Sequence, residues 1–238
     1  MKLLKLFVIV LLVFISKSAS SQSDFLESFQ NGGNPSIQNL NIRVSDNFGN
    51  KAHLPVSIIK GRKEGPVFSI VAGIHGYEYP PIIAVQKLIQ EINPDSLAGT
   101  LIIIPIANTS SFYGRSPFVN PDDRVNLNRS FPGKKIGSVT EQLANIITTE
   151  IIPVSNVFLD IHGGDANEDL LPFVCYYDNK EKLDHTRRAR ELAESSGFDY
   201  IVRYPYTLKA DKPAKYAFKQ AVQDGKTALS IECGKLGN

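Results

Sequence analysis

The stretch PVFSIVAGIHGYEYPP, residues 66–81, decides the fold because it joins a strand, a turn and the start of a helix. Residues 66–72 form a near-continuous apolar run, which is typical of a strand buried on both faces of a sheet. Two glycines follow, and Pro80 and Pro81 suit the first turn of a helix. The sequence therefore predicts a strand that leads through a glycine-rich turn into a helix.

Strands and helices alternate along the rest of the chain. The apolar patterns predict strands at 40–44, 54–59, 66–72, 100–106, 157–161, 170–177, 200–204 and 227–232. They predict helices at 80–92, 138–152, 180–197 and 211–225. The first two strands are expected to form a hairpin. Overall the alternation predicts an α/β domain built on a mixed, largely parallel sheet with helices on both faces.

The first twenty residues have the features of a secretory signal peptide. Lys2 and Lys5 give a basic start, residues 6–15 form an apolar core, and small residues occupy 18–20. The apolar core is too short to span a bilayer comfortably, which favours cleavage over an uncleaved anchor. We therefore expect an exported protein, periplasmic or secreted, from which residues 1–20 are removed.

The rest of the chain is expected to form one domain. Residues 21–37 have the composition of a polar, poorly ordered leader, which places the folded domain at 38–238. The signal peptide carries three lysines and no acidic residue, so its removal changes the net charge from +2 to −1. This charge does not indicate a nucleic-acid partner, and no later segment is expected to cross a membrane. The oligomeric state is left open.

Two of the four histidines follow buried strands directly. His75 comes after the strand at 66–72, and His162 ends the motif VFLDIH, residues 157–162. Glu232 ends the last predicted strand. Because the carboxyl ends of parallel strands meet at one edge of a sheet, we expect these three side chains to lie close together.

His75, Glu78 and His162 form a candidate metal site. Two imidazoles and one carboxylate are a known ligand combination of catalytic zinc, and they leave a position for water. A histidine three residues before a glutamate is a weak pattern by itself, and a simple glycine-rich turn is the alternative. The position of His162 favours the metal. Asp160 is expected on the same side of its strand as His162 and is a candidate to support that imidazole.

A loop of about thirty residues between the second and third buried strands concentrates polar side chains. It carries Arg115, Arg124, Asn126, Asn128 and Arg129. Long loops inside compact domains tend to be functional, and an arginine beside an asparagine is suited to bind a carboxylate. The alternative is a solvated polar loop. We interpret the loop as a substrate-binding segment.

The two cysteines do not form a disulfide framework or a metal cluster. Cys175 and Cys233 both lie in apolar, strand-like surroundings. Two buried thiols and a single bridge in an exported protein are both consistent with this placement.

Four motifs together resemble a known family. GIHGYE, NLNRSFPG, DIHGGD and IECG occur in the order seen in the succinylglutamate desuccinylase/aspartoacylase family, zinc deacylases of the carboxypeptidase-like clan. The resemblance covers residues 66–238 and implies a zinc carboxypeptidase-like fold. It also implies that His75, Glu78 and His162 bind one Zn²⁺ ion. Glu232 would take a proton from the attacking water and deliver it to the leaving amine.

The resemblance also implies roles for the long loop. Asn128 and Arg129 resemble the pair that binds the free carboxylate of the substrate. Arg115 is similar to the arginine that stabilises the oxyanion, and Arg124 is a competing candidate for that role. The implied activity is hydrolysis of a small N-acylated amino acid, with the acyl group and the amino acid left open.

Two further functions are compatible with the same residues. The first is an exported metallocarboxypeptidase that trims peptides, and the second is a non-catalytic protein that binds zinc or carboxylates. The family usually continues past the last motif into a β-rich region, whereas this chain stops six residues after Glu232. The sequence therefore predicts either a fragment or a truncated form with a more open site.

Overall fold

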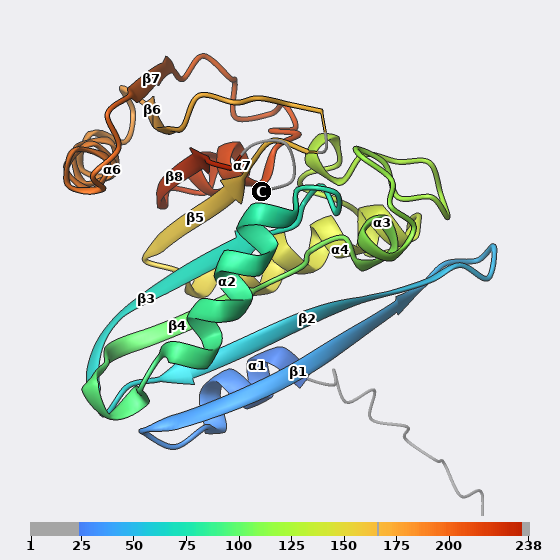
Figure 1. Cartoon of the computed structure of the whole chain (residues 1–238), viewed down its shortest axis with the longest axis horizontal. Helices are drawn as coiled ribbons and strands as arrows, with labels where there is room; N and C mark the ends of the chain where they lie inside the picture. Colours follow the sequence, from blue (N-terminus) through green and yellow to red (C-terminus); the bar gives the residue numbers. More distant parts are fainter. Residues whose placement is uncertain (1–23, 166, 235–238) are drawn as a thin grey trace, which may run out of the picture.

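The computed structural model describes residues 24–165 and 167–234. The predicted signal peptide, residues 1–20, lies outside these residues, so export stays a prediction. Within the described residues the chain forms one eight-stranded sheet with helices on its two faces, as Figure 1 shows.

The sheet has the strand order β1-β2-β4-β3-β5-β8-β6-β7. The pairs β4-β3, β3-β5, β5-β8 and β6-β7 are parallel, whereas β1-β2, β2-β4 and β8-β6 are antiparallel. This confirms the mixed, largely parallel sheet and the N-terminal hairpin. The strands are β1 (Ser36–Ser45), β2 (Lys51–Lys60), β3 (Lys63–Ala72), β4 (Ala98–Ile104), β5 (Val157–His162), β6 (Phe173–Asp178), β7 (Ile201–Pro205) and β8 (Thr227–Glu232).

Helices cover both faces because the central strands alternate their apolar side chains. Ile70 and Ile103 pack with Val85 of α2 on one face, whereas Val71 packs with the α4 and α7 side of the core. Figure 1 shows α2 on one side of β3 and β4, and α4 on the other. The helical elements are α1 (Asp24–Asn31), α2 (Tyr79–Glu91), η1 (Pro94–Ser96), α3 (Thr109–Tyr113), η2 (Leu127–Arg129), α4 (Val139–Ile146), η3 (Ile147–Ile151), α5 (Ile152–Val154), α6 (Leu183–Ser195) and α7 (Ala217–Gln223). No helix in the described ranges combines the length and apolar character needed to cross a bilayer.

The helices differ from their predicted bounds at their ends; α6, for example, covers Leu183–Ser195 and not 180–197. The helix that begins at the capping box of Ser138 and Glu141 continues through η3 and α5, with Pro153 inside its last turn. The helix predicted from residue 211 begins only at Ala217. The preceding residues are not helical: Lys215 has a φ of 71° and exchanges backbone hydrogen bonds with Phe131, at 3.0 and 3.2 Å. That pairing fastens the long loop to the start of α7.

The prediction of a poorly ordered leader is wrong for the part of it that the structure describes. Residues 24–31 form α1, and β1 already begins at Ser36. Phe25 has 0 % of its surface exposed and stacks on Phe29, with ring centroids 5.9 Å apart. The short amphipathic helix supplies an apolar stripe that covers the core. The folded domain therefore extends at least to Asp24 and does not start at residue 38.

The burial of Phe25 leads to a stability prediction. Phe25→Ala is expected to lower the free energy of unfolding by about 3–5 kcal/mol, because it removes a fully buried ring and leaves a cavity. Urea unfolding followed by circular dichroism measures this change. Phe48→Ala is the matched control, since Phe48 is 89 % exposed in the β1-β2 turn. Equal stability of the two variants would show that α1 does not pack on the sheet in solution.

Candidate metal centre and active-site pocket

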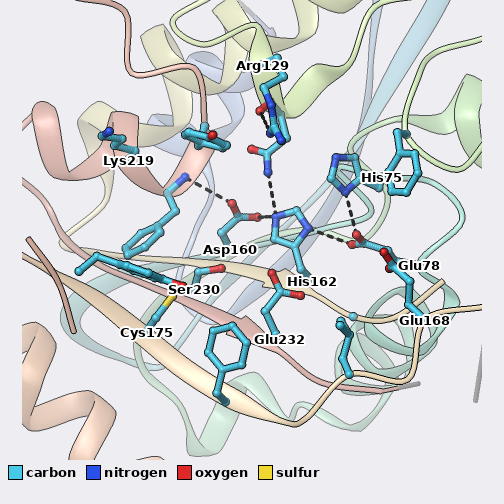
Figure 2. A pocket seen from close by; sticks show the side chains of 18 of the residues that line it. His75, Glu78, Arg129, Asp160, His162, Glu168, Cys175, Lys219, Ser230 and Glu232 are labelled. Atoms are coloured by element: carbon cyan, nitrogen blue, oxygen red, sulfur yellow. Dashed lines mark hydrogen bonds and ion pairs between the residues drawn. The ribbon is translucent and has the colours of Figure 1, made fainter. Parts of the chain in front are cut away.

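The candidate site forms where three neighbouring strands end. β5 lies between β3 and β8, and its last residue, His162, pairs in register with Glu232, the last residue of β8. His75 follows three residues after the end of β3. The expected meeting of these side chains at one edge of the sheet is therefore confirmed, and Figure 2 shows them around one pocket.

Glu78 lies between the two histidines. Its Oε1 is 2.7 Å from Nδ1 of His75, and its Oε2 is 2.9 Å from Nδ1 of His162. One ligand atom from each residue lies within 4.8 Å of the other two, and all three residues are buried. Two imidazole nitrogens and one carboxylate converge as the ligands of a divalent cation do.

The glycine-rich turn forms part of the candidate metal site. The N–H of Glu78 donates to the carbonyl oxygen of His75 at 3.3 Å, which closes the turn before α2. A Cβ on Gly76 would collide with the backbone of Ser111 and Phe112, so only glycine allows this close approach. The turn brings His75 and Glu78 to the same side, and β5 supplies His162.

The far nitrogens of both imidazoles also have polar neighbours. Nε2 of His75 is 3.3 Å from Oδ1 of Asn126, and Nε2 of His162 is 3.2 Å from Oδ1 of Asp160. Oδ2 of Asp160 accepts from the N–H of Phe218 at 3.3 Å. Such contacts at Nε2 orient each ring so that Nδ1, which faces Glu78, is the atom that would bind a metal. Asp160 therefore lies beside the imidazole of His162, as the sequence predicts. The sequence predicts Asn126 only as a member of the polar loop, because nothing in it links Asn126 to His75.

The ionisable groups of this site change one another's pKa values. Burial by itself would raise the pKa of Glu78, but the attraction and hydrogen bonds of His162 and His75 outweigh it and lower the pKa to about 2. Burial would lower the pKa of His162, but Asp160 and Glu78 outweigh it and raise the pKa well above its usual value. Glu78 is therefore held as a carboxylate, which suits it to bind a cation.

Glu232 lies beside this group without belonging to it. It lines the same pocket, and burial raises its pKa to about 7. The charge of His162 opposes that shift, whereas the carboxylates of Glu78, Asp160 and Glu168 add to it. A carboxyl group with a pKa near neutrality is suited to accept and return a proton during catalysis.

The long loop brings Asn128 and Arg129 into the pocket on η2. Oδ1 of Asn128 accepts from the N–H of Ala217 at 3.2 Å, and its Nδ2 is 3.4 Å from Nε2 of His162. Nη1 of Arg129 donates to the carbonyl oxygen of Asn128 at 2.6 Å, and its guanidinium lies 4.6 Å from the ring of Tyr216. The loop is anchored by Asp123, which accepts from the N–H and Oγ1 of Thr140, both at 2.9 Å.

The structure does not bring the two candidate oxyanion residues to the site. Arg115 and Arg124 are both exposed, and neither belongs to the described lining of the pocket. Both adopt left-handed backbone conformations, with φ of 50° and 62°. The N–H of Arg115 is bonded to Phe112 and that of Arg124 to Asn120, so each sits in a turn at the loop surface. Among the residues described, the arginine and lysine side chains that line the pocket are Arg129 and Lys219.

The pocket has a volume of about 630 Å³ and an aromatic wall. The aromatic residues that line it are Phe118, Phe173, Tyr177, Tyr204, Tyr216 and Phe218. Cys175 also lines it, but burial raises the pKa of its thiol to about 12, so it is not a thiolate nucleophile. Cys175 and Cys233 are both free thiols, which excludes the bridged alternative, and only Cys175 is buried, so the expectation of two buried thiols is wrong for Cys233.

A family model, the succinylglutamate desuccinylase/aspartoacylase catalytic domain, matches residues 64–238. The chain is 37 % identical over 186 residues to an N-alpha-acetyl-L-2,4-diaminobutyric acid deacetylase from Halomonas elongata. That alignment covers 77 % of this chain and 52 % of the relative, so the chain spans about half the length of that protein.

Solved structures of this family have the same fold. A succinylglutamate desuccinylase/aspartoacylase from Rhodobacter sphaeroides matches with a TM-score of 0.74 and 22 % identity, over 85 % of this chain and 59 % of that one. The product-bound ectoine utilization protein EutE (DoeB) from Ruegeria pomeroyi matches with a TM-score of 0.73 and 25 % identity, over 87 % of this chain and 62 % of that one.

Proposed function

Because the chain belongs to the succinylglutamate desuccinylase/aspartoacylase family, we propose that it is a zinc-dependent hydrolase that removes an acyl group from N-acylated amino acids. One observation carries this proposal. Glu78 lies 2.7 and 2.9 Å from the Nδ1 atoms of His75 and His162, in a pocket that Glu232 also lines. This places a ligand set for a metal next to a carboxyl group that is suited to transfer protons.

The residues present fit a single zinc ion. His75, Glu78 and His162 would hold it, and this ligand set is one that catalytic zinc uses. Asn126 and Asp160 would keep the two imidazoles oriented through their Nε2 atoms. When bound, the metal supplies Lewis-acid activation of water and of the scissile carbonyl group.

The chain itself supplies the proton transfer. Glu232 accepts a proton from the attacking water as the C–O bond forms at the carbonyl carbon. It then gives that proton to the nitrogen atom as the C–N bond breaks, so the products are a carboxylic acid and an amine. The pKa of about 7 leaves a large share of Glu232 in the basic form at neutral pH.

The long loop supplies substrate positioning. Arg129 carries a guanidinium beside Asn128, and the two line the pocket next to the metal-binding group. A guanidinium forms paired hydrogen bonds with a carboxylate, which would hold the amino acid part with its amide directed toward His75 and His162. The name of the relative from Halomonas elongata makes N-acetyl-2,4-diaminobutyrate the first substrate to test.

Metal removal and restoration test this function. The purified protein is expected to contain close to one equivalent of zinc and to hydrolyse one or more of a panel of N-acetyl and N-succinyl amino acids. Dialysis against a chelator is expected to abolish hydrolysis, and added zinc to restore it, because the ligand set is otherwise intact. Metal analysis and a chromatographic assay of the released amine measure both.

Three other results would contradict the proposal. A protein that binds no zinc would refute the metal site. Release of C-terminal residues from peptides without any deacylation would support a metallocarboxypeptidase. Zinc and acyl amino acid binding without turnover would support a non-catalytic binding protein.

A further inference from the structure

Glu168 lines the pocket but has no part in the proposed reaction. It lies on the segment between β5 and β6, in a compact turn. The N–H of Glu168 donates to the carbonyl oxygen of Asp165 at 3.2 Å, and the N–H of Asp165 donates to Oε2 of Glu168 at 3.3 Å. A Cβ on Gly164 would collide with the carbonyl oxygen of Glu168, so a glycine is needed there. The turn fixes Glu168 beside the metal-binding group, as Figure 2 shows.

The surroundings of Glu168 do not balance its charge. None of the ion pairs among residues 24–165 and 167–234 includes Glu168. A carboxylate that lines the pocket and has no ionic partner among the described residues is available to a cation of the bound substrate.

The other side of the pocket has the opposite charge. Figure 2 shows Arg129 and Lys219 on the far side of His162 from Glu168. Nζ of Lys219 lies 5.5 Å from the ring centroid of Tyr177, and Arg129 lies over Tyr216. None of the ion pairs in the described part of the chain includes Arg129 or Lys219. The pocket therefore matches a ligand with a negative group at one end and a positive group at the other.

We propose that Glu168 binds the free ammonium group of the substrate and thereby selects N-acylated diamino acids. This inference rests on the proposed deacylase function. The carboxylate of such a substrate would lie against Arg129, its amide next to His75 and His162, and its side-chain ammonium against Glu168. Glu168 is a specificity residue in this arrangement, since it contacts the substrate away from the bond that breaks.

Glu168→Gln tests the charge alone, because the amide oxygen of glutamine still accepts from the N–H of Asp165. The assay compares Nα-acetyl-2,4-diaminobutyrate with N-acetylnorvaline, which has a neutral side chain of nearly the same shape. For the cationic substrate, kcat/KM is expected to fall roughly 10- to 100-fold, mainly through KM, as for loss of a charge-assisted hydrogen bond. For N-acetylnorvaline it is expected to change by no more than about twofold.

Asp169→Asn is the matched control, because it makes the same charge change at the next, exposed position and is expected to leave the preference unchanged. Equal losses for both substrates with Glu168→Gln would assign Glu168 a structural or general catalytic role and overturn the proposal. Unchanged kinetics would also overturn it. So would a second equivalent of bound metal that depends on Glu168.

Product binding separates this inference from the proposed function. Calorimetry compares 2,4-diaminobutyrate with norvaline, in the wild-type protein and in Glu168→Gln. Failure of every acyl amino acid to be hydrolysed would refute the deacylase, whereas weaker binding of diaminobutyrate alone to Glu168→Gln would still support ammonium recognition. Equal binding of diaminobutyrate to the wild-type protein and to Glu168→Gln would overturn the proposal that Glu168 binds the ammonium group.

Discussion

Glu78→Gln is expected to reduce the zinc content of the purified protein from about one equivalent to nearly none. The same change is expected to lower kcat/KM by about 1,000-fold or more, because the Lewis acid contributes several kcal/mol to the reaction. Glu78 has this effect because its two oxygens lie at 2.7 and 2.9 Å from the two imidazoles that complete the site. A glutamine has the same shape but lacks the charge, and its amide nitrogen cannot bind a cation.

Metal analysis after gel filtration measures the loss, and circular dichroism shows whether the variant is folded. Glu91→Gln is the matched control, since Glu91 is exposed at the C-terminal end of the same helix, α2. It is expected to keep its zinc and its activity. A Glu78→Gln protein that is folded and still binds one equivalent would show that the metal lies elsewhere or needs only the histidines.

The sheet and the centre of the site could be predicted because both depend on local patterns. A near-continuous apolar run identifies the strand at 66–72, and the apolar residues around Asp160 identify the strand at 157–161. Parallel strands bring their carboxyl ends to one edge, so the residues that follow them, His75 and His162, had to be neighbours if those strands were adjacent. Their adjacency, through the pairing of β3 with β5, is a property of the tertiary fold, which no single segment determines.

The parts that sequence reasoning missed depend on contacts between distant segments. Residues 21–37 have a polar composition, which gives no indication that Phe25 is buried. The burial of Phe25 depends on the complete core, to which distant segments contribute. Arg115 and Arg124 have the right chemistry for an oxyanion, but turns within the loop place both at the surface. Glu168 reaches the pocket only because its turn packs on Gly164. The sequence therefore identifies the polar side chains that a loop contains, whereas the backbone conformation of the loop determines which of these side chains line the pocket.

Glu232→Gln is expected to keep one equivalent of zinc and to lose most of the activity. A fall in kcat of about 10²- to 10⁴-fold is expected, since glutamine cannot accept a proton from water or return it to the amine. Zinc is retained because Glu232 does not belong to the group formed by His75, Glu78 and His162. Rapid-quench or steady-state assays of the released amine measure the loss, and metal analysis measures the zinc.

The pH profile provides a second test of the same residue. Burial raises the pKa of Glu232 to about 7, and the reaction needs its carboxylate form. Activity of the wild-type protein is therefore expected to fall as the pH drops through this pKa. A bound zinc ion stabilises the carboxylate and moves the acidic limb to lower pH, so the limb is expected at or below about 7.

Loss of this acidic limb in Glu232→Gln distinguishes proton transfer from a structural effect, because a merely distorted site would keep the pH dependence of its base. Glu181→Gln is the control, with an exposed carboxylate outside the pocket. If Glu232→Gln retained both the activity and the limb, another carboxylate would have to be the base. Glu168, which lines the same pocket, would then be the first candidate, and its assignment to the substrate ammonium would fall as well.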